Sequence, residues 1–381
     1  MTDYPSRPTS CSIDLSALRN NFRFLRKSAT ASGKLLAVVK ADAYGHGAAE
    51  VSKELEKMGV DFLGVAILEE AIELREAGIK APILLLGGLF PGQEGAIFEY
   101  DLTPLVFSLD WARKINDEAI LRKEKKKIHL KIDTGMGRIG VQTEEVRDFF
   151  SSIRELSSIE VEGAATHFAS ADAPEGAPGN DYTALQRKRF KEALAAVQSL
   201  GFNIPLIHAA NSAALFNHPD TIFNMARPGI LLYGASPLLA GARGDELKCV
   251  MSFKTRIMDV KSVKKGFRVS YDGTYTAPGD RKIAVIPVGY ADGYRRELSG
   301  KGEVLVRGKR AHIAGRICMD MTMIDVSGID GVEAGDEVLL FGENGTDRLP
   351  VDEVAALAGT ISYEILCGIT KRVPKRYINA L

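Results

Sequence analysis

Short hydrophobic runs alternate with amphipathic stretches between residues 34 and 235. The first run, LLAVVKA (35–41), is rich in β-branched and other apolar residues, which favour a buried strand. In the next stretch, 47–59, apolar residues recur every three or four positions, and Gly59 provides a stop signal. The same order returns when FLGVA is followed by ILEEAIELREAG (67–78), which also ends on glycine. The pattern predicts repeated strand–helix units.

Eight hydrophobic runs in this part of the chain are typical of strands separated by helical segments: 35–41, 62–66, 82–88, 102–107, 127–134, 161–169, 206–210 and 224–234. Continuous apolar strands are typical of a parallel sheet that is buried on both faces. Eight such units predict a (β/α)8 TIM-type barrel. A doubly wound open sheet is the alternative, but no GxGxxG follows the first strand.

The pattern changes after about residue 245, where strand-like runs are spaced by Gly, Asp and Lys turns. No long helical pattern returns until VDEVAALAG (351–359). These runs predict a mainly antiparallel β domain: 250–263, 267–271, 282–290, 302–308, 311–317 and 336–342. We therefore expect an α/β plus β fold with a barrel over 13–245 and a β domain over 246–381. The segment 1–12 is a candidate partner of the second sheet.

Chain length and net charge limit the number of domains and the kinds of partner. At roughly 150 residues per domain, the 381 residues suggest two domains or three. Forty-nine basic residues balance 49 acidic ones, so the chain has no long-range attraction for nucleic acid or anionic lipid. The one dense basic run, RKEKKK (122–127), follows a helical pattern, and we interpret it as a solvated helix end. No nucleic-acid or membrane partner is expected.

The cysteines and histidines predict neither a metal site nor a disulfide framework. None of the four cysteines has CxxC spacing: Cys11, Cys249, Cys318 and Cys367. The histidines show no HExxH spacing. The N-terminal residues lack an apolar core, and no apolar run approaches the ~20 residues that cross a bilayer. We expect a cytoplasmic protein without a metal.

Polar residues gather where the predicted barrel strands end: Lys40, Lys131, Asp133, His167, Asn211, Ser212, Arg227, Gly229 and Ile230. In a barrel these ends converge on the face where active sites are built. Lys40 lies between apolar LLAVV and the small, turn-forming ADAYGHG. Apolar surroundings lower the pKa of an amine, which favours imine formation with an aldehyde. A surface lysine is the plainer interpretation of this one residue.

The segment VVKADAYGHG around Lys40 resembles the pyridoxal-phosphate (PLP) lysine motif of alanine racemases, which are fold-type III PLP enzymes. Further segments resemble the other signatures of that family in the same order: LKIDTGMGRIG, THFASAD, HAANSAA, ARPGILLYG, VSYDGTY, PVGYADG, GRICMDM and ISYEILCGI. Together they cover nearly the whole chain. The resemblance implies an alanine racemase that interconverts L-alanine and D-alanine and supplies D-alanine for peptidoglycan.

The resemblance also implies a two-base mechanism on a PLP external aldimine. Lys40 holds PLP and, once the substrate has displaced it, is the base facing the hydrogen of D-alanine; Tyr271 is the opposing base for L-alanine. A phenol ionises near pH 10, so a tyrosine base needs positive charge nearby, which His167 and Arg227 are expected to supply. Arg227 also resembles the donor to the pyridine nitrogen. Because arginine keeps its proton, the cofactor becomes a weak electron sink and transamination is suppressed.

The remaining site residues follow from the same resemblance. The cofactor is expected to contact Tyr44, His167, Asn211, Ser212, Arg227, Gly229, Ile230 and Tyr363. The substrate is expected to contact Arg138, Tyr290, Cys318 and Met319, with Asp320 alongside. From the residues alone, Asn211 is equally a helix N-cap. Lys131 resembles a lysine that family members carry as a carbamate, whose negative charge orients Arg138.

The family places Tyr271 and Met319 at the lysine of the other subunit. The resemblance therefore implies a homodimer with two composite sites. One departure is Asp272, which stands where the family commonly has glycine after the base tyrosine. A carboxylate beside a tyrosine base disfavours its ionised form.

Three other functions fit part of the pattern. A fold-type III decarboxylase shares the barrel and the β domain, although GRICMDM and VSYDGTY resemble the racemase versions of those motifs. A broad-specificity or serine-preferring racemase differs only in the substrate it accepts, because one methylene discriminates by only ~1–3 kcal/mol. A PLP-carrying homeostasis protein has the barrel alone, without the second domain that carries Tyr271.

Overall fold

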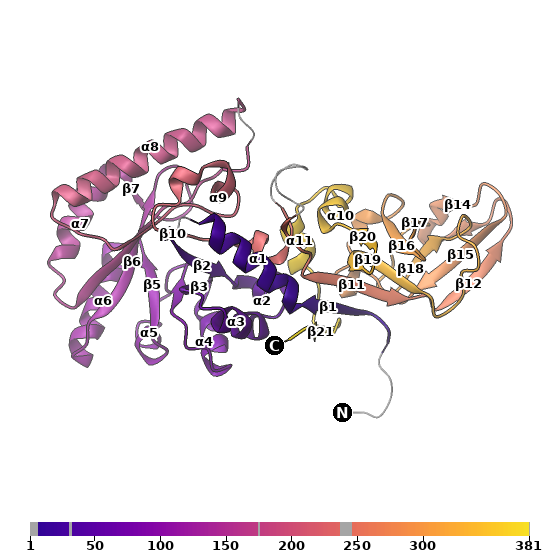
Figure 1. The fold of residues 1–381 in the computed structure, drawn as a ribbon, viewed down its shortest axis with the longest axis horizontal. Helices are drawn as coiled ribbons and strands as arrows, with labels where there is room; N and C mark the ends of the chain where they lie inside the picture. Colours follow the sequence, from indigo (N-terminus) through magenta and orange to yellow (C-terminus); the bar gives the residue numbers. More distant parts are fainter. Residues whose placement is uncertain (1–6, 30–32, 174–175, 237–245, 381) are drawn as a thin grey trace.

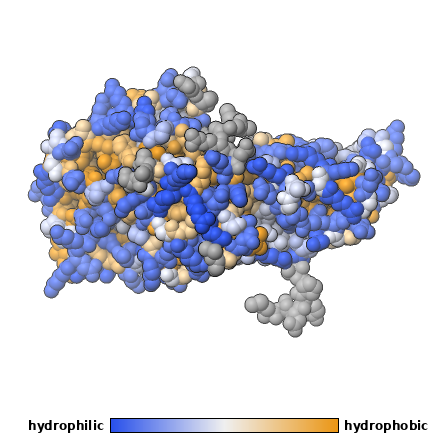
Figure 2. Space-filling view, viewed as in Figure 1, coloured by the Kyte–Doolittle hydropathy of each residue, from blue (hydrophilic) through white to orange (hydrophobic). Residues whose placement is uncertain are grey.

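The structure is a computed structural model that describes residues 7–29, 33–173, 176–236 and 246–380. A barrel forms one end of the molecule and a β domain forms the other (Figure 1). On the face seen in Figure 2, hydrophobic residues show mainly over the barrel, and hydrophilic residues cover most of the second domain. The expected boundary at residue 245 lies outside the described residues.

The N-terminal sheet is a nearly closed barrel of eight parallel strands within the described ranges. In spatial order these strands are β10 (Met225–Ala226), β2 (Lys34–Val38), β3 (Phe62–Val65), β4 (Ile83–Leu85), β5 (Leu102–Val106), β6 (Lys126–Asp133), β8 (Ile159–Ala165) and β9 (Leu206–His208). A 2.9 Å hydrogen bond from the Arg227 N–H to the Ala210 carbonyl links the residues that follow β10 and β9, the first and the last strand in this order. The predicted (β/α)8 barrel is confirmed. A short strand, β7 (Val141–Gln142), pairs in parallel with the last two residues of β6.

Helices cover the outside of the barrel: α1 (Leu15–Ser28), α3 (Ala48–Lys57), α4 (Leu68–Glu76), α5 (Ala96–Glu99), α6 (Leu109–Arg122), α7 (Val146–Arg154), α8 (Pro178–Ser199) and α9 (Ala214–Asn217). The helices predicted after the first two strands are present. Each ends before the expected glycine, and Gly59 and Gly78 have φ of +73° and +89°. These left-handed values are favourable for glycine, which lacks a Cβ.

The last predicted strand, 224–234, is wrong over most of its length. Only Met225–Ala226 is extended, and Ile230–Tyr233 forms a 3-10 turn. Pro228 has no N–H to donate to a ladder, and Gly229 has φ −120° and ψ −90°, which is not a strand conformation. Arg227, Gly229 and Ile230 therefore lie in a loop after the strand.

Three smaller predictions are also corrected. The strand predicted over 35–41 ends at Val38, so Lys40 begins the next turn, and His167 follows the end of β8. The basic run 122–127 is not all solvated. Lys126 is the first residue of β6, is buried, and donates a 2.7 Å hydrogen bond to the Ile97 carbonyl.

The second domain is the predicted, mainly antiparallel sheet. Its strands are β11 (Met251–Arg256), β12 (Asp259–Val263), β15 (Arg281–Ile286), β16 (Glu303–Val306), β17 (Lys309–Ile313), β18 (Thr322–Asp325), β19 (Glu337–Asn344) and β20 (Asp347–Leu349), with the separate hairpin β13 (Arg268–Val269) and β14 (Tyr275–Thr276). The helix expected at 351–359 is α10 (Val351–Ala358). A second helix, α11 (Ser362–Cys367), was not predicted.

The two ends of the chain meet in the second sheet. Strand β1 (Ser10–Asp14) pairs antiparallel with β11 and parallel with β21 (Lys375–Ile378). Asp14 then caps α1 by accepting the N–H groups of Ser16 and Ala17, so the chain passes from the second sheet to the barrel within one residue. One continuous hydrophobic core includes residues of both domains. Among the helices of the described ranges, none combines the length and apolar character needed to cross a membrane.

Candidate active site

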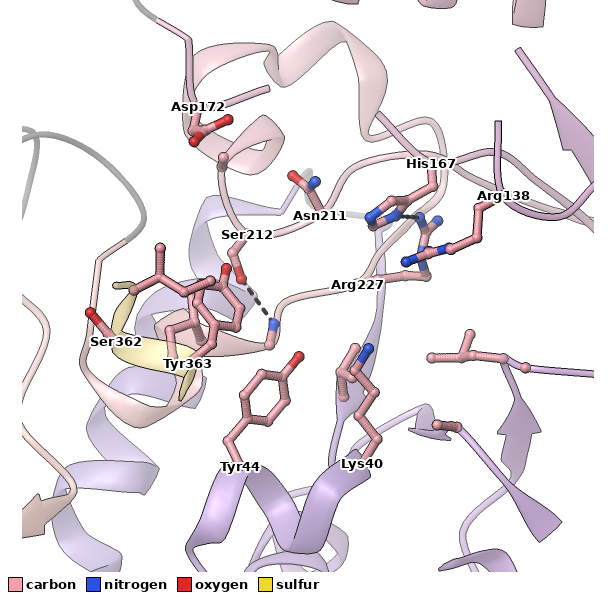
Figure 3. A pocket seen from close by; sticks show the side chains of 18 of the residues that line it. Lys40, Tyr44, Arg138, His167, Asp172, Asn211, Ser212, Arg227, Ser362 and Tyr363 are labelled. Carbon is pink, nitrogen blue, oxygen red and sulfur yellow. Dashed lines mark hydrogen bonds between the residues drawn. The ribbon is translucent and has the colours of Figure 1, made fainter. Parts of the chain in front are cut away.

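A cavity of about 840 Å³ lies at the carboxyl ends of the barrel strands. Helices α10 and α11 of the second domain form part of its wall. The predicted site residues that line it are Lys40, Tyr44, Lys131, Arg138, His167, Asn211, Ser212, Arg227, Gly229, Ile230 and Tyr363. Figure 3 shows that Lys40 and Tyr44 point into this cavity from the same short helix. The structure therefore brings the barrel part of the predicted site together.

The helix that carries Lys40, α2 (Lys40–Gly45), contains a left-handed turn. Residues 41–44 all have φ between +52° and +54°. For non-glycine residues this conformation costs about 1–2 kcal/mol each, so the surroundings must hold it. One support is Glu70, whose carboxylate accepts the N–H groups of Ala41 at 2.6 Å and of Ala66 at 2.7 Å.

Two further groups hold the same turn. The Nδ1 of His46 lies 3.0 Å from the Ala43 carbonyl and 2.9 Å from the Tyr44 carbonyl. Because carbonyls only accept, Nδ1 must carry the hydrogen. Asp42 accepts the N–H of Ala48 and forms a 2.7 Å ion pair with the Nζ of Lys375. The terminal strand β21 therefore contacts the turn that carries the candidate catalytic lysine.

Burial lowers the pKa of Lys40, and the nearby Arg138 guanidinium lowers it further. The carboxylate of Glu70 acts in the opposite direction. The shift increases the fraction of neutral amine, which is the form that attacks an aldehyde. Lys40 thus has the environment that was expected of an imine-forming lysine.

One side of the cavity is lined by hydroxyl groups and closely packed backbone. The Oγ of Ser212 accepts the Gly229 N–H at 2.9 Å. A Cβ on Gly229 would lie 2.5 Å from the Tyr44 hydroxyl, so only glycine fits. Burial raises the pKa of Tyr44, which keeps its hydroxyl protonated as a donor. Asn211 uses its Oδ1 to accept the Ala214 N–H at 3.0 Å, as a cap does.

Arg227 is buried and fixed by several hydrogen bonds. Its Nη1 lies 3.0 Å from the Nδ1 of His208, and its Nη2 donates to the carbonyls of Thr166 at 2.8 Å and Ala209 at 3.1 Å. The same Nη2 lies 3.3 Å from the Nδ1 of His167. No carboxylate contacts the guanidinium in the described part of the chain. Its Nε–H has no protein partner there and remains available to a ligand.

The charges of Arg227 and His167 differ from the expectation that both residues supply positive charge. Burial and the Arg138 cation lower the pKa of Arg227 to about 10, which still leaves it protonated at neutral pH. Burial, and then Arg227 and other cations, hold the pKa of His167 well below its usual range. His167 is therefore neutral in this chain, and Arg227 is the source of the positive charge.

Lys131 is buried among cations. Burial, Arg227 and Arg138 together hold its pKa well below the usual range, with Asp133 opposing. The Asp133 carboxylate is also occupied by the Gly135 N–H at 2.9 Å. This shift favours the neutral amine of Lys131, which is the form that reacts with carbon dioxide.

Four predicted residues of the second domain do not line this cavity: Tyr271, Tyr290, Cys318 and Met319. They lie near one another, because the Tyr290 N–H donates to the Cys318 carbonyl at 3.1 Å and Ser270 donates to the Arg316 carbonyl at 2.6 Å. Three of their side chains are exposed, with exposed fractions of 67% for Tyr271, 52% for Met319 and 41% for Tyr290, whereas Cys318 is half-buried. Tyr271 precedes β14, which lies toward the end of the domain that points away from the barrel (Figure 1).

Asp272, the departure from the expected glycine, adopts a left-handed conformation with φ +59°. Its carboxylate forms a 2.6 Å ion pair with Arg316. This pairing offsets the negative charge beside Tyr271.

The sequence did not single out two groups of functional neighbours. Glu70 had only one signal, an acidic residue in the first turn of a helix that follows a strand. His129 and His208 had no metal-binding spacing, yet both lie buried beneath Arg227. Hydrogen-bond chains of this kind connect residues far apart in sequence, and spacing does not show them.

Comparisons with known proteins identify relatives along the whole chain. Two family models, described as the N-terminal and the C-terminal domain of alanine racemase, match residues 13–237 and 250–377. A curated alanine racemase of Geobacter sulfurreducens is 46% identical over 375 residues, which cover 98% of each chain. The solved alanine racemase of D-cycloserine-producing Streptomyces lavendulae has a TM-score of 0.92 at 35% identity and covers 99% of both chains. That of Bacillus anthracis, solved with bound L-Ala-P, has a TM-score of 0.89 at 37% identity and covers 99% of this chain and 96% of that one.

Proposed function

Because the chain belongs to the alanine racemase family of PLP-dependent isomerases, we propose that it interconverts L-alanine and D-alanine. The observation that carries the proposal is the cavity that places Lys40 opposite Arg227, beside a cluster of hydroxyl and backbone donors. We further propose that the enzyme is cytoplasmic and supplies D-alanine for peptidoglycan. Its four cysteines are free thiols, as suits a reducing compartment. We keep 13–245 and 246–381 as the proposed domains, with residues before 13 joined to the second.

The lining of the cavity fits PLP. Lys40 provides an amine with a lowered pKa for the cofactor aldehyde, and the Nε–H of Arg227 is available for the ring nitrogen. The phosphate would take the hydroxyls of Tyr44 and Ser212, with those of Tyr363 and the backbone at 229–230 beside them. When bound, PLP supplies an aldehyde that captures amino acids and a conjugated ring that stabilises negative charge on the α-carbon.

We propose that Lys131 is carbamylated. Its neutral amine would add carbon dioxide and release one proton, leaving an N-carboxylate among the cations Arg138 and Arg227. This anion would orient the Arg138 guanidinium toward the substrate carboxylate, which suits a bidentate donor. Intact-protein mass should show one carbon dioxide per chain that is lost on acidification. A bare lysine at neutral pH would contradict this.

Racemisation requires two groups on opposite faces of the α-carbon, one to remove a proton and one to deliver another. We propose Lys40 for the face of the D-enantiomer and Tyr271 for the face of the L-enantiomer. Because Tyr271 of the same chain lies outside the cavity, the second group must come from another copy. An exposed apolar cluster in the second domain supports such a contact: Phe267, Tyr271, Tyr290, Met319 and Met321.

The proposed enzyme is therefore a homodimer with composite sites. Tyr271 of one subunit would reach the cavity of its partner, where Tyr290 narrows the entrance. Beside it, the backbone amide of Met319, with Cys318 next in the chain, would bind the alanine carboxylate. A small pocket of this kind accepts serine slowly, because size alone discriminates weakly.

Isotope exchange tests this proposal. Each alanine enantiomer is incubated with the PLP-loaded enzyme in deuterated water, and loss of the α-hydrogen, appearance of the other enantiomer and carbon dioxide are followed. We expect both enantiomers to exchange and interconvert without carbon dioxide. Tyr271→Phe should impair exchange of L-alanine far more than that of D-alanine. Equal losses would remove the two-base assignment, and release of carbon dioxide would indicate a decarboxylase.

A further inference from the structure

A line of buried polar groups leads from Arg227 through the interior of the barrel. The Nη1 of Arg227 lies 3.0 Å from the Nδ1 of His208, and the Nε2 of His208 lies 2.9 Å from the Nδ1 of His129. The Nε2 of His129 lies 3.4 Å from Glu162, which in turn accepts from the Nζ of Lys127 at 2.9 Å. Both imidazoles are completely buried. The line thus connects the cavity to a carboxylate near the barrel surface.

The chemistry of the groups fixes every proton in this line. A guanidinium only donates, so the Nδ1 of His208 must accept. A neutral His208 then carries its hydrogen on Nε2 and donates to the Nδ1 of His129. His129 must accept there, so its own hydrogen is on Nε2 and points to Glu162. A second proton on either ring would place two donors face to face.

Strand β8 of the barrel is irregular where it packs against His129. Strands β6 and β8 pair in regular register up to Ile128 and Val161, but His129 pairs with Gly163, so Glu162 is an extra residue in β8. Such bulges are rare between parallel strands and redirect a side chain. A Cβ at Gly163 would overlap the His129 ring, so glycine makes room for the imidazole. The bulge at Glu162 and the glycine at 163 therefore both make room for the contact between His129 and Glu162.

We propose that Glu162 is a positioning residue that acts on Arg227 through His129 and His208 and keeps it a weak donor to the cofactor ring. This proposal rests on the proposed function, in which Arg227 meets the pyridine nitrogen. The carboxylate pulls both imidazole hydrogens toward itself, and polarised chains of hydrogen bonds strengthen one another. The Nδ1 of His208 thereby becomes a better acceptor and holds the Arg227 proton more firmly.

The pKa shifts along this line agree with an ionised Glu162 and two neutral imidazoles. The contact with His129, and then Lys127, lowers the pKa of Glu162 to about 2, so the carboxylate is ionised at neutral pH. Burial lowers the pKa values of His129 and His208, which agrees with neutral rings. Arg227, a buried cation without a carboxylate contact in the described ranges, is thus linked to its counter-charge through two imidazoles.

The proposal predicts a change in side reaction when the charge of Glu162 is removed. The amide oxygen of Glu162→Gln can still accept from His129, so the order of hydrogens along the two imidazoles is kept. The variant loses the negative charge and, with it, the hydrogen bond from Lys127. Arg227 then donates more strongly to the ring, which becomes a better electron sink. Transamination increases: the amino group of alanine passes to the cofactor, the α-carbon is oxidised to the ketone of pyruvate, and the cofactor aldehyde is reduced to an amine. Water supplies the ketone oxygen of pyruvate, and no other reactant is required.

The experiment compares the PLP-loaded wild type with Glu162→Gln and with Glu160→Gln, an exposed control on the same strand. We expect the ratio of pyruvate formed to alanine racemised to rise about 3- to 30-fold in Glu162→Gln, the range of remote couplings, and to stay unchanged in Glu160→Gln. The pH dependence of the bound cofactor's visible absorbance should shift in Glu162→Gln alone. Unchanged ratio and absorbance, with the wild type active, would overturn the proposal.

A second measurement does not depend on racemase activity. Nitrogen-15 spectra of histidine-labelled protein report which ring nitrogen carries hydrogen. We expect His129 and His208 to be neutral with hydrogen on Nε2, both at pH 6 and at pH 8. Hydrogen on the Nδ1 of either ring, or a protonated ring in that range, would overturn the proposed chain. An inactive wild type with the expected spectra would instead refute the proposed function.

Discussion

Four cationic side chains share one cavity: Lys40, Lys131, Arg138 and Arg227. Burial and the neighbouring cations lower the pKa of both lysines, which favours their neutral amine form. Burial lowers the pKa of Arg227 to about 10, which leaves it protonated at neutral pH. The residues thus divide into amines whose charge the site disfavours and arginines, a residue type that keeps its proton in proteins. Chemistry that needs a free amine beside fixed positive charge follows from this division.

His46 makes the stability of the fold depend on pH. Burial lowers its pKa to about 4 from 6.5. Between these values the unfolded state binds more protons, so the free energy of unfolding falls as pH decreases below 6.5. This difference in pKa lowers the free energy of unfolding by about 3 kcal/mol once the pH has fallen below the folded-state value. In His46→Asn, whose amide still donates to the turn carbonyls, urea unfolding should show a shallower loss between pH 6.5 and 4.

The other buried histidines remain in both proteins, so the comparison isolates His46. The slope of the unfolding free energy against pH is the quantity to compare, because Asn also changes its absolute value. Identical slopes for His46→Asn and the wild type would show that His46 is protonated at the same pH in both states.

Residues at strand ends were predictable from the sequence, and their neighbours were not. Lys40, Lys131 and Arg227 stand out because a polar side chain follows an apolar run. The roles of Tyr271 and Met319 came from resemblance alone, since each is an ordinary residue of a β domain. Glu70 and Glu162 act through hydrogen bonds to residues far away in sequence, a property that no local pattern carries.

At the scale of elements, the left-handed turn in α2 is the least regular part of the site. It holds Lys40 and Tyr44 on one short segment, and Glu70, His46 and Asp42 hold it in place. Residues 41–44 each have a Cβ, which is sterically unfavourable in the left-handed conformation; glycine has no Cβ and lacks this strain.

This strain predicts an unusual response to glycine. Ala41→Gly relieves about 1–2 kcal/mol of left-handed strain, offset by about 0.4–1 kcal/mol from the freer unfolded chain. The free energy of unfolding in urea should stay equal or rise slightly. The matched change Ala195→Gly, at an exposed position in the right-handed α8, should lose about 1 kcal/mol. Similar losses at both positions would contradict the left-handed turn.

Element length decided which parts of the fold the sequence predicted. Helices α3, α4 and α10 have enough residues to show a period, and most barrel strands lie within longer apolar runs, so both were predicted. Strand β10 is two residues long, and Pro228 and Gly229 end it inside an apolar run. Helix α11 has six residues, too few for a periodic signal, although it places Tyr363 in the cavity wall.

At the scale of the whole molecule, one chain contains both proposed bases but does not bring them together. Lys40 lies in the cavity, whereas Tyr271 does not line it and is 67% exposed. Strand β21 and the ion pair between Asp42 and Lys375 join the two domains within one chain. The proposed two-base site would therefore need a second subunit, which the sequence predicted only through resemblance.

Mixing two inactive variants tests directly whether the active site combines residues of two subunits. Lys40→Ala and Tyr271→Phe are each purified, loaded with PLP, mixed in equal amounts under conditions that exchange subunits, and assayed for racemisation of L-alanine. In a mixed dimer, one site combines the intact Lys40 of one subunit with the intact Tyr271 of its partner. Random exchange should restore about one quarter of the wild-type activity, because half of the dimers are mixed and each holds one intact site. Activity no higher than that of the separate variants, with subunit exchange verified by mass, would contradict the composite site.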